Sequence, residues 1–152
     1  MFYYMDSPIG VLQIESKGDV LYSVRIINNF TSEFVTPNDN IIVKQLNEYF
    51  AGSRTVFNIN KKLIGTPFQL RVWQALEEIP YGETVTYKQI AEKIGQPKAV
   101  RAVGGAIHRN PIPIIIPCHR VVGSNGKMVG FAFGIGIKEW LLKLENSINN
   151  QN

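Results

Sequence analysis

The spacing of apolar residues changes at about residue 66, and this change limits the folds available to the chain more than any other feature. Before it, short runs of β-branched and aromatic residues alternate with turn residues, a pattern typical of strands. After it, apolar residues recur every three or four positions, as they do on one face of a helix. We therefore expect an α+β protein with its sheet in the first part and mostly helices in the second.

The first part predicts three strands, one helix and a fourth strand. Residues 17–19 join the second and third strands as a hairpin, and Gly52 ends the helix, whose N-cap we expect at Asn38 or Asp39. The segment 58–66 is the expected linker between two domains. The predicted strands cover residues 2–5, 10–16, 20–27 and 54–60, and the helix lies within residues 39–52.

Capping residues mark the helix starts of the second part. Thr66 precedes Pro67, a residue preferred at the first helical position, and Thr86 begins a capping box with Gln89 three residues later. Pro97 is expected to open the next helix in the same way. The buried face of the first of these helices is expected to hold Phe68, Val72, Trp73, Leu76 and Ile79, and that of the last helix, 135–148, to hold Ile137, Leu141, Leu144 and Ile148.

Two short helices around the turn at residues 95–97 form a candidate helix-turn-helix at about residues 87–109. In its second helix, Gly104 and Gly105 share a face with Arg101. Glycine inside a helix costs about 1 kcal/mol relative to alanine, so two adjacent glycines need a reason. Either they let a phosphodiester backbone approach closely, or a neighbouring helix packs against them. The opposite face is expected to bury Val100, Val103 and Ile107.

The net charge of +4 is concentrated in the second part of the chain. Residues 1–64 carry six basic and six acidic side chains, whereas residues 84–127 carry seven basic side chains and one acidic one. This asymmetry favours a polyanionic partner, most simply nucleic acid, although a solvated basic face would have the same composition. Since no signal-like segment or membrane-length apolar run occurs, we expect a cytoplasmic, intracellular protein without membrane association.

Cys118 is the only cysteine, and it lies in the apolar stretch "IIIPCHRVV". A single cysteine and two histidines argue against structural zinc and predict a free thiol in a reducing compartment. His119 is a candidate base, acting through a bridging water because adjacent side chains point apart. Glu145, at the edge of the last helix, could orient such a base. Simple burial of the Cys-His pair would also suit this spacing. A rigid, extended connector to Cys118 is expected from Pro111, Pro113 and Pro117.

These motifs together resemble the O6-alkylguanine-DNA alkyltransferases, also called methylated-DNA-protein-cysteine methyltransferases. The resemblance runs without gaps from about Gly65 to Glu145 and rests on "RAVGGAIHRNPIPII", "IPCHRV", "GSNG" and "KEWLLKLE". In the first part, "SPIG", the hairpin and "LNEYFAG" are similar to the family's other domain. The resemblance implies a ribonuclease-H-like α/β domain at residues 1–62 and a winged helix-turn-helix, DNA-binding alkyltransferase domain at residues 63–152.

The resemblance also implies a suicide DNA-repair reaction. The protein would flip O6-alkylguanine, and also O4-alkylthymine, out of double-stranded DNA and transfer the alkyl group irreversibly to Cys118. His119 would take the thiol proton through a water, and Glu145 would orient His119. Tyr87 would help to rotate the nucleotide and donate to the guanine ring. Asn110 would lie between the recognition helix and the active-site strand.

Further roles follow from the same resemblance. Arg101 would fill the gap left by the flipped nucleotide, and Arg120 would tie the two domains together. Binding through the minor groove is expected at Tyr87, Lys98, Arg101, Ala102, Gly104, Gly105 and His108. The guanine pocket is expected at Pro113, Val121, Met128, Val129, Gly130, Phe131 and Ala132. The family pattern implies a monomer that uses no cofactor and no metal and reacts once.

The sequence departs from the family pattern in the expected pocket. Phe133 stands where relatives usually have glycine, which would narrow the pocket mouth, and Phe131 and Ala132 replace residues that usually carry hydroxyl groups. Two other functions compete with alkyl transfer. A non-catalytic alkyltransferase-like binder would lack the cysteine, and a winged-helix transcription regulator would read the major groove, where paired glycines offer no advantage.

Overall fold

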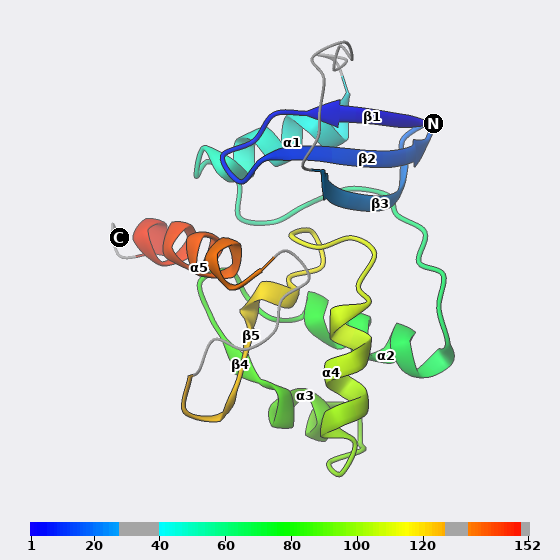
Figure 1. The fold of residues 1–152 in the computed structure, drawn as a ribbon, viewed down its shortest axis with the longest axis vertical. Coiled ribbons are helices and arrows are strands. Elements are labelled where there is room, and N and C mark those ends of the chain that lie inside the picture. Colours follow the sequence, from blue (N-terminus) through cyan, green and yellow to red (C-terminus); the bar gives the residue numbers. More distant parts are fainter. Residues whose placement is uncertain (28–39, 127–133, 150–152) are drawn as a thin grey trace. The chain divides into compact units, whose positions relative to one another are not determined.

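The structure is a computed structural model that describes residues 1–27, 40–126 and 134–149, without the side chains of residues 147–149 (Figure 1). The chain forms two compact units, which we call unit 1 (Met1–Leu63) and unit 2 (Ile64–Asn152). The predicted mixture of a small sheet and several helices is confirmed. None of the helices in the described ranges is long and apolar enough to cross a membrane.

Unit 1 is built on a three-stranded antiparallel sheet in the order β1, β2, β3. Its strands are β1 (Phe2–Met5), β2 (Val11–Lys17) and β3 (Val20–Ile27), close to the predicted bounds. Gly18 adopts a φ of 60° in the predicted hairpin, a conformation that glycine tolerates best. Side chains on one face of the sheet are buried, among them Tyr3, Met5, Leu12, Ile14, Leu21 and Val24.

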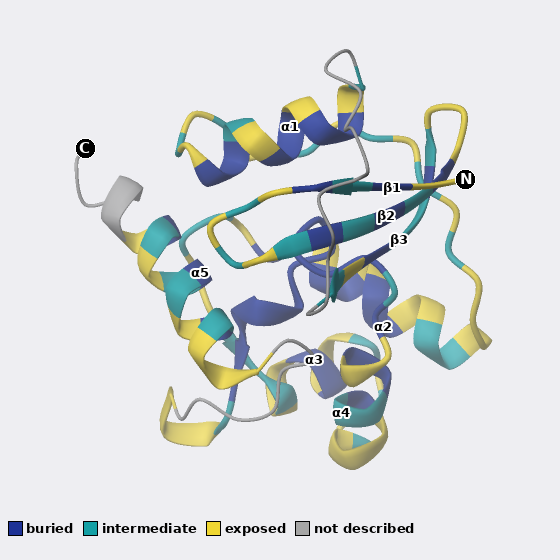
Figure 2. Ribbon diagram, turned by 45° about the horizontal axis from the view of Figure 1, so that its top comes forward, coloured by how far each residue is buried: buried dark blue, intermediate teal, exposed yellow. Residues whose placement is uncertain are grey.

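Helix α1 (Ile41–Phe50) covers the sheet with its apolar face (Figure 2). Its N-cap is Asn40, whose side-chain oxygen accepts hydrogen bonds from the backbone N–H groups of Ile42 and Val43 at 2.9 and 3.1 Å. The prediction of Asn38 or Asp39 as the cap is therefore wrong, and both of these residues lie outside the described ranges. Gly52 follows the helix with a φ of 83°, as predicted.

The predicted strand at residues 54–60 does not form. Instead, the side chain of Gln45 in α1 forms two hydrogen bonds with the backbone of Asn58. It donates to the Asn58 carbonyl at 3.0 Å and accepts from the Asn58 N–H at 2.8 Å. A backbone residue held in this way has no groups left for a strand ladder. Just after this segment, Lys61 makes an isolated bridge to the sheet, opposite Leu21.

Unit 2 combines four α-helices with a two-stranded parallel sheet. Thr66 and Thr86 both cap their helices as predicted; the predicted capping box of Thr86 with Gln89 is present, and Thr66 forms a further one with Gln69. Short turns of 3-10 helix occur at Cys118–Arg120 and Ser124–Gly126. The remaining elements are α2 (Pro67–Glu77), β4 (Val85–Thr86), α3 (Tyr87–Lys93), α4 (Val100–His108), β5 (Val121–Val122) and α5 (Ile135–Asn149).

Helices α2, α3 and α4 pack against one another (Figure 1). The indole N–H of Trp73 in α2 donates to the Ala106 carbonyl of α4 at 2.8 Å, which satisfies a carbonyl in the last turn of that helix. The predicted apolar face of α2 is buried except at its start, where Phe68 is half-buried. In α5, Leu141 is buried, Ile137 and Leu144 are half-buried, and the Ile148 side chain is outside the description.

Two local predictions for unit 2 need correction. Helix α4 begins at Val100 rather than Pro97, because Pro97 belongs to a turn and the N-cap residue, Ala99, has no capping side chain. Val100 is 36% exposed, so the buried face of α4 is made by other residues, namely Val103, Ala106 and Ile107. The connector to Cys118 is also not fully extended, since Ile114 turns the chain with a φ of 77°.

Candidate active site

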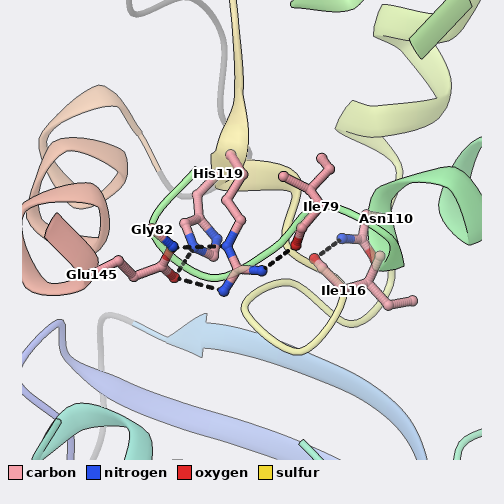
Figure 3. Close-up of polar contacts among 7 residues, drawn as sticks. Ile79, Gly82, Asn110, Ile116, His119 and Glu145 are labelled. Carbon is pink, nitrogen blue, oxygen red and sulfur yellow. Dashed lines mark hydrogen bonds and ion pairs between the residues drawn. The ribbon is translucent and has the colours of Figure 1, made fainter. Parts of the chain in front are cut away.

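Cys118 lies at the start of the 3-10 turn that follows Pro117, not on a strand, and its side chain is 3% exposed. Asn110 organises the connector before it: its amide N–H donates to the Ile116 carbonyl at 2.9 Å, and its amide oxygen accepts from the Ile112 N–H at 2.9 Å. The structure thus joins the end of α4 to the segment that carries the thiol (Figure 3).

The Cys118 thiol is protonated at neutral pH. Burial raises its pKa to about 11, although a hydrogen bond from Asn110 and the positive charge of Lys138 act in the opposite direction. A thiol becomes a strong nucleophile only as the thiolate. Chemistry at Cys118 therefore requires a group that takes its proton when the substrate is in place.

His119 is completely buried and faces Glu145 of α5, with 2.6 Å between His119 Nε2 and Glu145 Oε2 (Figure 3). An ionised carboxylate can only accept hydrogen bonds, so Nε2 carries the hydrogen and donates it. The other ring nitrogen, Nδ1, then holds a lone pair. Nδ1 is buried and has no hydrogen-bond partner among the described residues. Burial lowers the pKa of His119, although Glu145 opposes this effect, so the ring is neutral at pH 7.

Arg120 holds the same carboxylate from its other side. Its Nε donates to Oε1 of Glu145 at 2.8 Å and its Nη2 to Oε2 at 3.0 Å, while Nη1 donates to the Ile79 carbonyl at 2.7 Å. The backbone N–H of Gly82 adds a contact to Oε1 at 3.3 Å. The guanidinium also lies over the ring of Tyr81, 5.6 Å from its centroid. The carboxylate is therefore fixed by bonds from three residues on two segments, His119 and Arg120 of the 3-10 turn and Gly82.

These contacts keep Glu145 ionised in a buried place. Burial alone would raise the pKa of its carboxyl, but the hydrogen bonds from His119 and Arg120 and the charge of Arg120 outweigh burial and bring the pKa to about 2. Because His119 is neutral, Arg120 supplies the permanent positive charge. The hydrogen bonds of Arg120 to described residues lie within unit 2, and the expected tie between domains stays a prediction.

Lys138 is a buried residue that the sequence pattern does not single out. It lies in the first turns of α5, its side chain is completely buried, and its ammonium donates to the Val121 carbonyl of β5. A fully buried lysine is rare unless it is paired, so its burial in the structure marks Lys138 as a candidate functional residue. From sequence alone, a lysine in "KEWLLKLE" reads as part of the solvated face of a helix.

The residues predicted to contact DNA gather around α4 and the turn before it. Tyr87, in the first turn of α3, is half-buried; burial, then the charge of Cys118, raises its pKa. The tyrosine therefore lies near the thiol as well as beside α4. A pocket of about 350 Å³ opens next to it, lined by Thr86, Tyr87, Lys88, Pro97, Val100 and Ser124. The exposed residues of this face include Lys98, Arg101, Ala102 and His108.

The two glycines of α4 are not required by packing within the described structure. A Cβ atom at Gly104 would lie 3.9 Å from the Tyr87 ring, an ordinary contact, and one at Gly105 would lie 3.5 Å from the mobile end of the Arg109 side chain. No backbone of a described neighbouring helix approaches either position within 4 Å. Close helix packing therefore does not explain them.

Only part of the predicted guanine pocket falls in the described ranges. Pro113 and Val121 are buried near Cys118, Pro113 in a bridge with Ile116 and Val121 in β5. Within these ranges, no group of three or more His, Cys, Asp or Glu side chains could hold a metal ion. The positions outside the described ranges are Met128, Val129, Gly130, Phe131, Ala132 and Phe133.

This combination of a small sheet, a helical unit and a buried Cys-His-Glu group is similar to known proteins. A family model described as "6-O-methylguanine DNA methyltransferase, DNA binding domain" matches residues 67–147. A methylated-DNA-protein-cysteine methyltransferase of Mycobacterium tuberculosis is 48% identical over 97% of this chain and 94% of its own. One from Methanosarcina acetivorans is 61% identical over 68% of this chain and 67% of its own.

Solved structures agree with the sequence comparison. The crystal structure of Mycobacterium tuberculosis OGT in complex with DNA matches with a TM-score of 0.88 and 48% identity, covering 97% of this chain and 93% of that one. The crystal structure of Mycobacterium tuberculosis O6-methylguanine methyltransferase matches with a TM-score of 0.84 and 46% identity, covering 97% and 94%. The chain belongs to the methylated-DNA-protein-cysteine methyltransferase family.

Proposed function

We propose that this protein repairs alkylated DNA by moving the alkyl group from O6 of guanine, and from O4 of thymine, to its own Cys118. The observation that carries the proposal is the state of His119. Its Nε2 donates to the ionised carboxylate of Glu145, and its Nδ1 is a buried acceptor with no hydrogen-bond partner among the described residues. His119 also directly follows the residue that carries the thiol. A base held in this way can take the proton of Cys118.

The proposed reaction begins with proton transfer. The Cys118 proton passes through a water to Nδ1 of His119, and the resulting imidazolium is stabilised by Glu145. The thiolate sulfur then attacks the alkyl carbon in line, a carbon–sulfur bond forms, and the bond from that carbon to O6 breaks. Its electron pair leaves with guanine, which gains a proton for which Tyr87 is the proposed donor. The thioether product is not reversed by thiol exchange, so each molecule reacts once.

The target base must leave the DNA stack to reach a buried thiol, at a cost of a few kcal/mol. We propose that the exposed face of α4 enters the minor groove, where Gly104 and Gly105 let a DNA strand approach and Arg101 fills the space of the flipped nucleotide. Lys98 and His108 would contribute positive charge or hydrogen bonds at the edges of this face. Phosphate contacts of this kind position the protein without reading sequence.

The proposed domain organisation follows the family. Residues 1–62 would form a ribonuclease-H-like domain, and residues 63–152 a winged helix-turn-helix domain whose α3 and α4 make up the motif. The protein would act as a cytoplasmic monomer, without a cofactor or metal. The basic charge of residues 84–127 supports the assignment of DNA as the partner of this second domain.

One mass measurement tests the reaction. The protein is incubated with duplex DNA containing O6-methylguanine and weighed intact, with Cys118→Ser as the matched control. We expect the wild-type chain to gain one methyl group and the variant none, while both bind the duplex. A non-catalytic binder or a transcription regulator would gain no mass in either form. Methyl transfer to the serine variant would disprove the assigned nucleophile.

A further inference from the structure

Four ionisable side chains are buried in the part of unit 2 that holds Cys118. They are His119, Arg120, Lys138 and Glu145. Glu145 is negative and Arg120 is positive, and their two-point contact at 2.8 and 3.0 Å pairs one charge with the other. His119 is neutral, because burial lowers its pKa. Lys138 is the second basic side chain among the four besides Arg120, and it is completely buried.

The position of Lys138 is set by two segments of unit 2. Its backbone N–H donates to the Gly134 carbonyl at 3.1 Å at the beginning of α5, and its ammonium donates to the Val121 carbonyl, three residues after the thiol. The side chain therefore reaches from α5 across to the strand that leaves the 3-10 turn of Cys118. Helix α5 and this 3-10 turn are in contact.

Lys138 and Cys118 act on each other electrostatically. Burial lowers the pKa of Lys138 and a charged Cys118 raises it, while the positive charge of Lys138 lowers the pKa of Cys118. An ammonium and a thiolate thus stabilise each other in a place where either charge alone is costly. Among the described residues, the other polar or ionisable groups that face Cys118 or its immediate neighbours are Tyr81, Tyr87, Asn110, His119, Arg120 and Glu145.

We propose that the buried ammonium of Lys138 supplies the positive charge that stabilises the Cys118 thiolate, while His119 acts as a neutral base. This inference rests on the proposed alkyl transfer and adds to it a residue whose side chain is completely buried. Lys138 is thus a positioning residue that acts through the thiol. In this proposal, His119 and Glu145 remove the proton of the thiol, and the ammonium of Lys138 stabilises the thiolate that forms.

Three substitutions separate the charge of Lys138 from its hydrogen bond. Lys138→Arg keeps the charge and the donor, Lys138→Gln keeps a donor for the Val121 carbonyl without the charge, and Lys138→Met keeps neither. Lys143→Met is the matched control, because Lys143 is exposed on the same helix. If Lys138 only anchors α5 to β5, the glutamine variant will resemble the arginine variant. If its charge matters, the glutamine variant will resemble the methionine variant.

The thiol itself is the readout, without DNA. Since the chain has one cysteine, the rate of alkylation by iodoacetamide, followed by intact mass between about pH 6 and about pH 12, reports Cys118 alone. Ultraviolet thiolate absorbance, corrected with Cys118→Ser, gives the same titration without requiring reagent access. We expect the glutamine and methionine variants to titrate at higher pH and to react at least about tenfold more slowly at pH 7, as one unit of pKa implies. The arginine variant and the Lys143 control should stay within about threefold.

An unchanged thiol titration in the glutamine or methionine variant would overturn the proposal, even if transfer from DNA were slower. If those two variants do not fold, the arginine variant decides: a titration moved to higher pH despite a retained charge would overturn it. Methyl transfer from O6-methylguanine DNA is measured in parallel. A wild-type protein that fails to transfer methyl but shows the expected thiol titrations would disprove the proposed function and leave the role of Lys138 standing.

Discussion

Replacing Gly104 and Gly105 of α4 with alanine should make the free protein more stable and its complex with DNA weaker. The two effects have opposite signs because they arise in different states. In the free protein, a helical glycine loses more backbone freedom on folding than alanine does. On DNA, a methyl group on the exposed face of α4 would meet the strand that the glycines are proposed to admit.

The magnitude on folding follows from the space around each glycine. Both positions accept a Cβ atom without a clash, with nearest neighbours at 3.9 Å for Gly104 and 3.5 Å for Gly105. Each substitution should therefore gain most of the helix-propensity difference, about 1 kcal/mol. In a chain of this size, about 1 kcal/mol raises Tm by roughly 2 to 4 °C. Overpacking at a closely fitted surface costs about 1 to 3 kcal/mol, so we expect DNA affinity to fall by roughly five- to 150-fold.

Thermal unfolding and binding to an O6-methylguanine duplex at fixed salt measure the two effects. Gly136→Ala is the matched control, because Gly136 also lies in a helix and no described atom lies within 4 Å of the added Cβ position. The control should gain stability and keep its affinity for DNA. The argument is refuted if the α4 variants gain stability and still bind DNA like the wild type. A loss of stability would instead show that an intramolecular neighbour needs the glycines.

Three further results are expected. Arg101→Ala should slow methyl transfer and weaken DNA binding equally on duplexes of different sequence, because phosphate and stacking contacts do not read bases; a loss restricted to some sequences in binding assays would contradict this. Stability should fall on acidification, because the folded pKa values of His119 and Glu145 lie below their unfolded values near 6.5 and 4.5. The Glu145 contribution is fully present above about pH 4.5 and disappears towards about pH 2, with a slope of up to about 1.4 kcal/mol per pH unit. Denaturant titrations should show this slope flattened in Glu145→Gln, and an unchanged slope would refute the assignment. Methylated Cys118 should lower Tm and loosen DNA together, because an added group in a packed site costs about 1 to 3 kcal/mol; an alkylated protein as stable as the free one would disprove it.

The amino-acid sequence alone determined the features that depend on neighbouring residues. Thr66 and Thr86 were predicted to cap their helices because a hydroxyl bonds to an N–H only three residues away, and both do so. The hairpin at Gly18 and the end of α1 at Gly52 also depend on local geometry, because glycine tolerates the positive φ that both positions adopt. The family resemblance also lies in contiguous motifs, which is why the alkyltransferase family could be recognised before the fold was known.

The tertiary structure decided what depends on residues far apart in the chain. Residues 54–60 have the composition of a strand, but a glutamine of α1 binds the backbone of Asn58 within them, and no local pattern indicates this contact. Arg120 bonds to a carboxylate 25 residues later in the chain, a partner that no local pattern indicates. Lys138 is buried only because α5 returns to β5, and a sequence presents it as an ordinary surface lysine. Burial and charge pairing depend on the folded unit, so the shifted pKa values of Cys118 and His119 could be derived only from the tertiary structure.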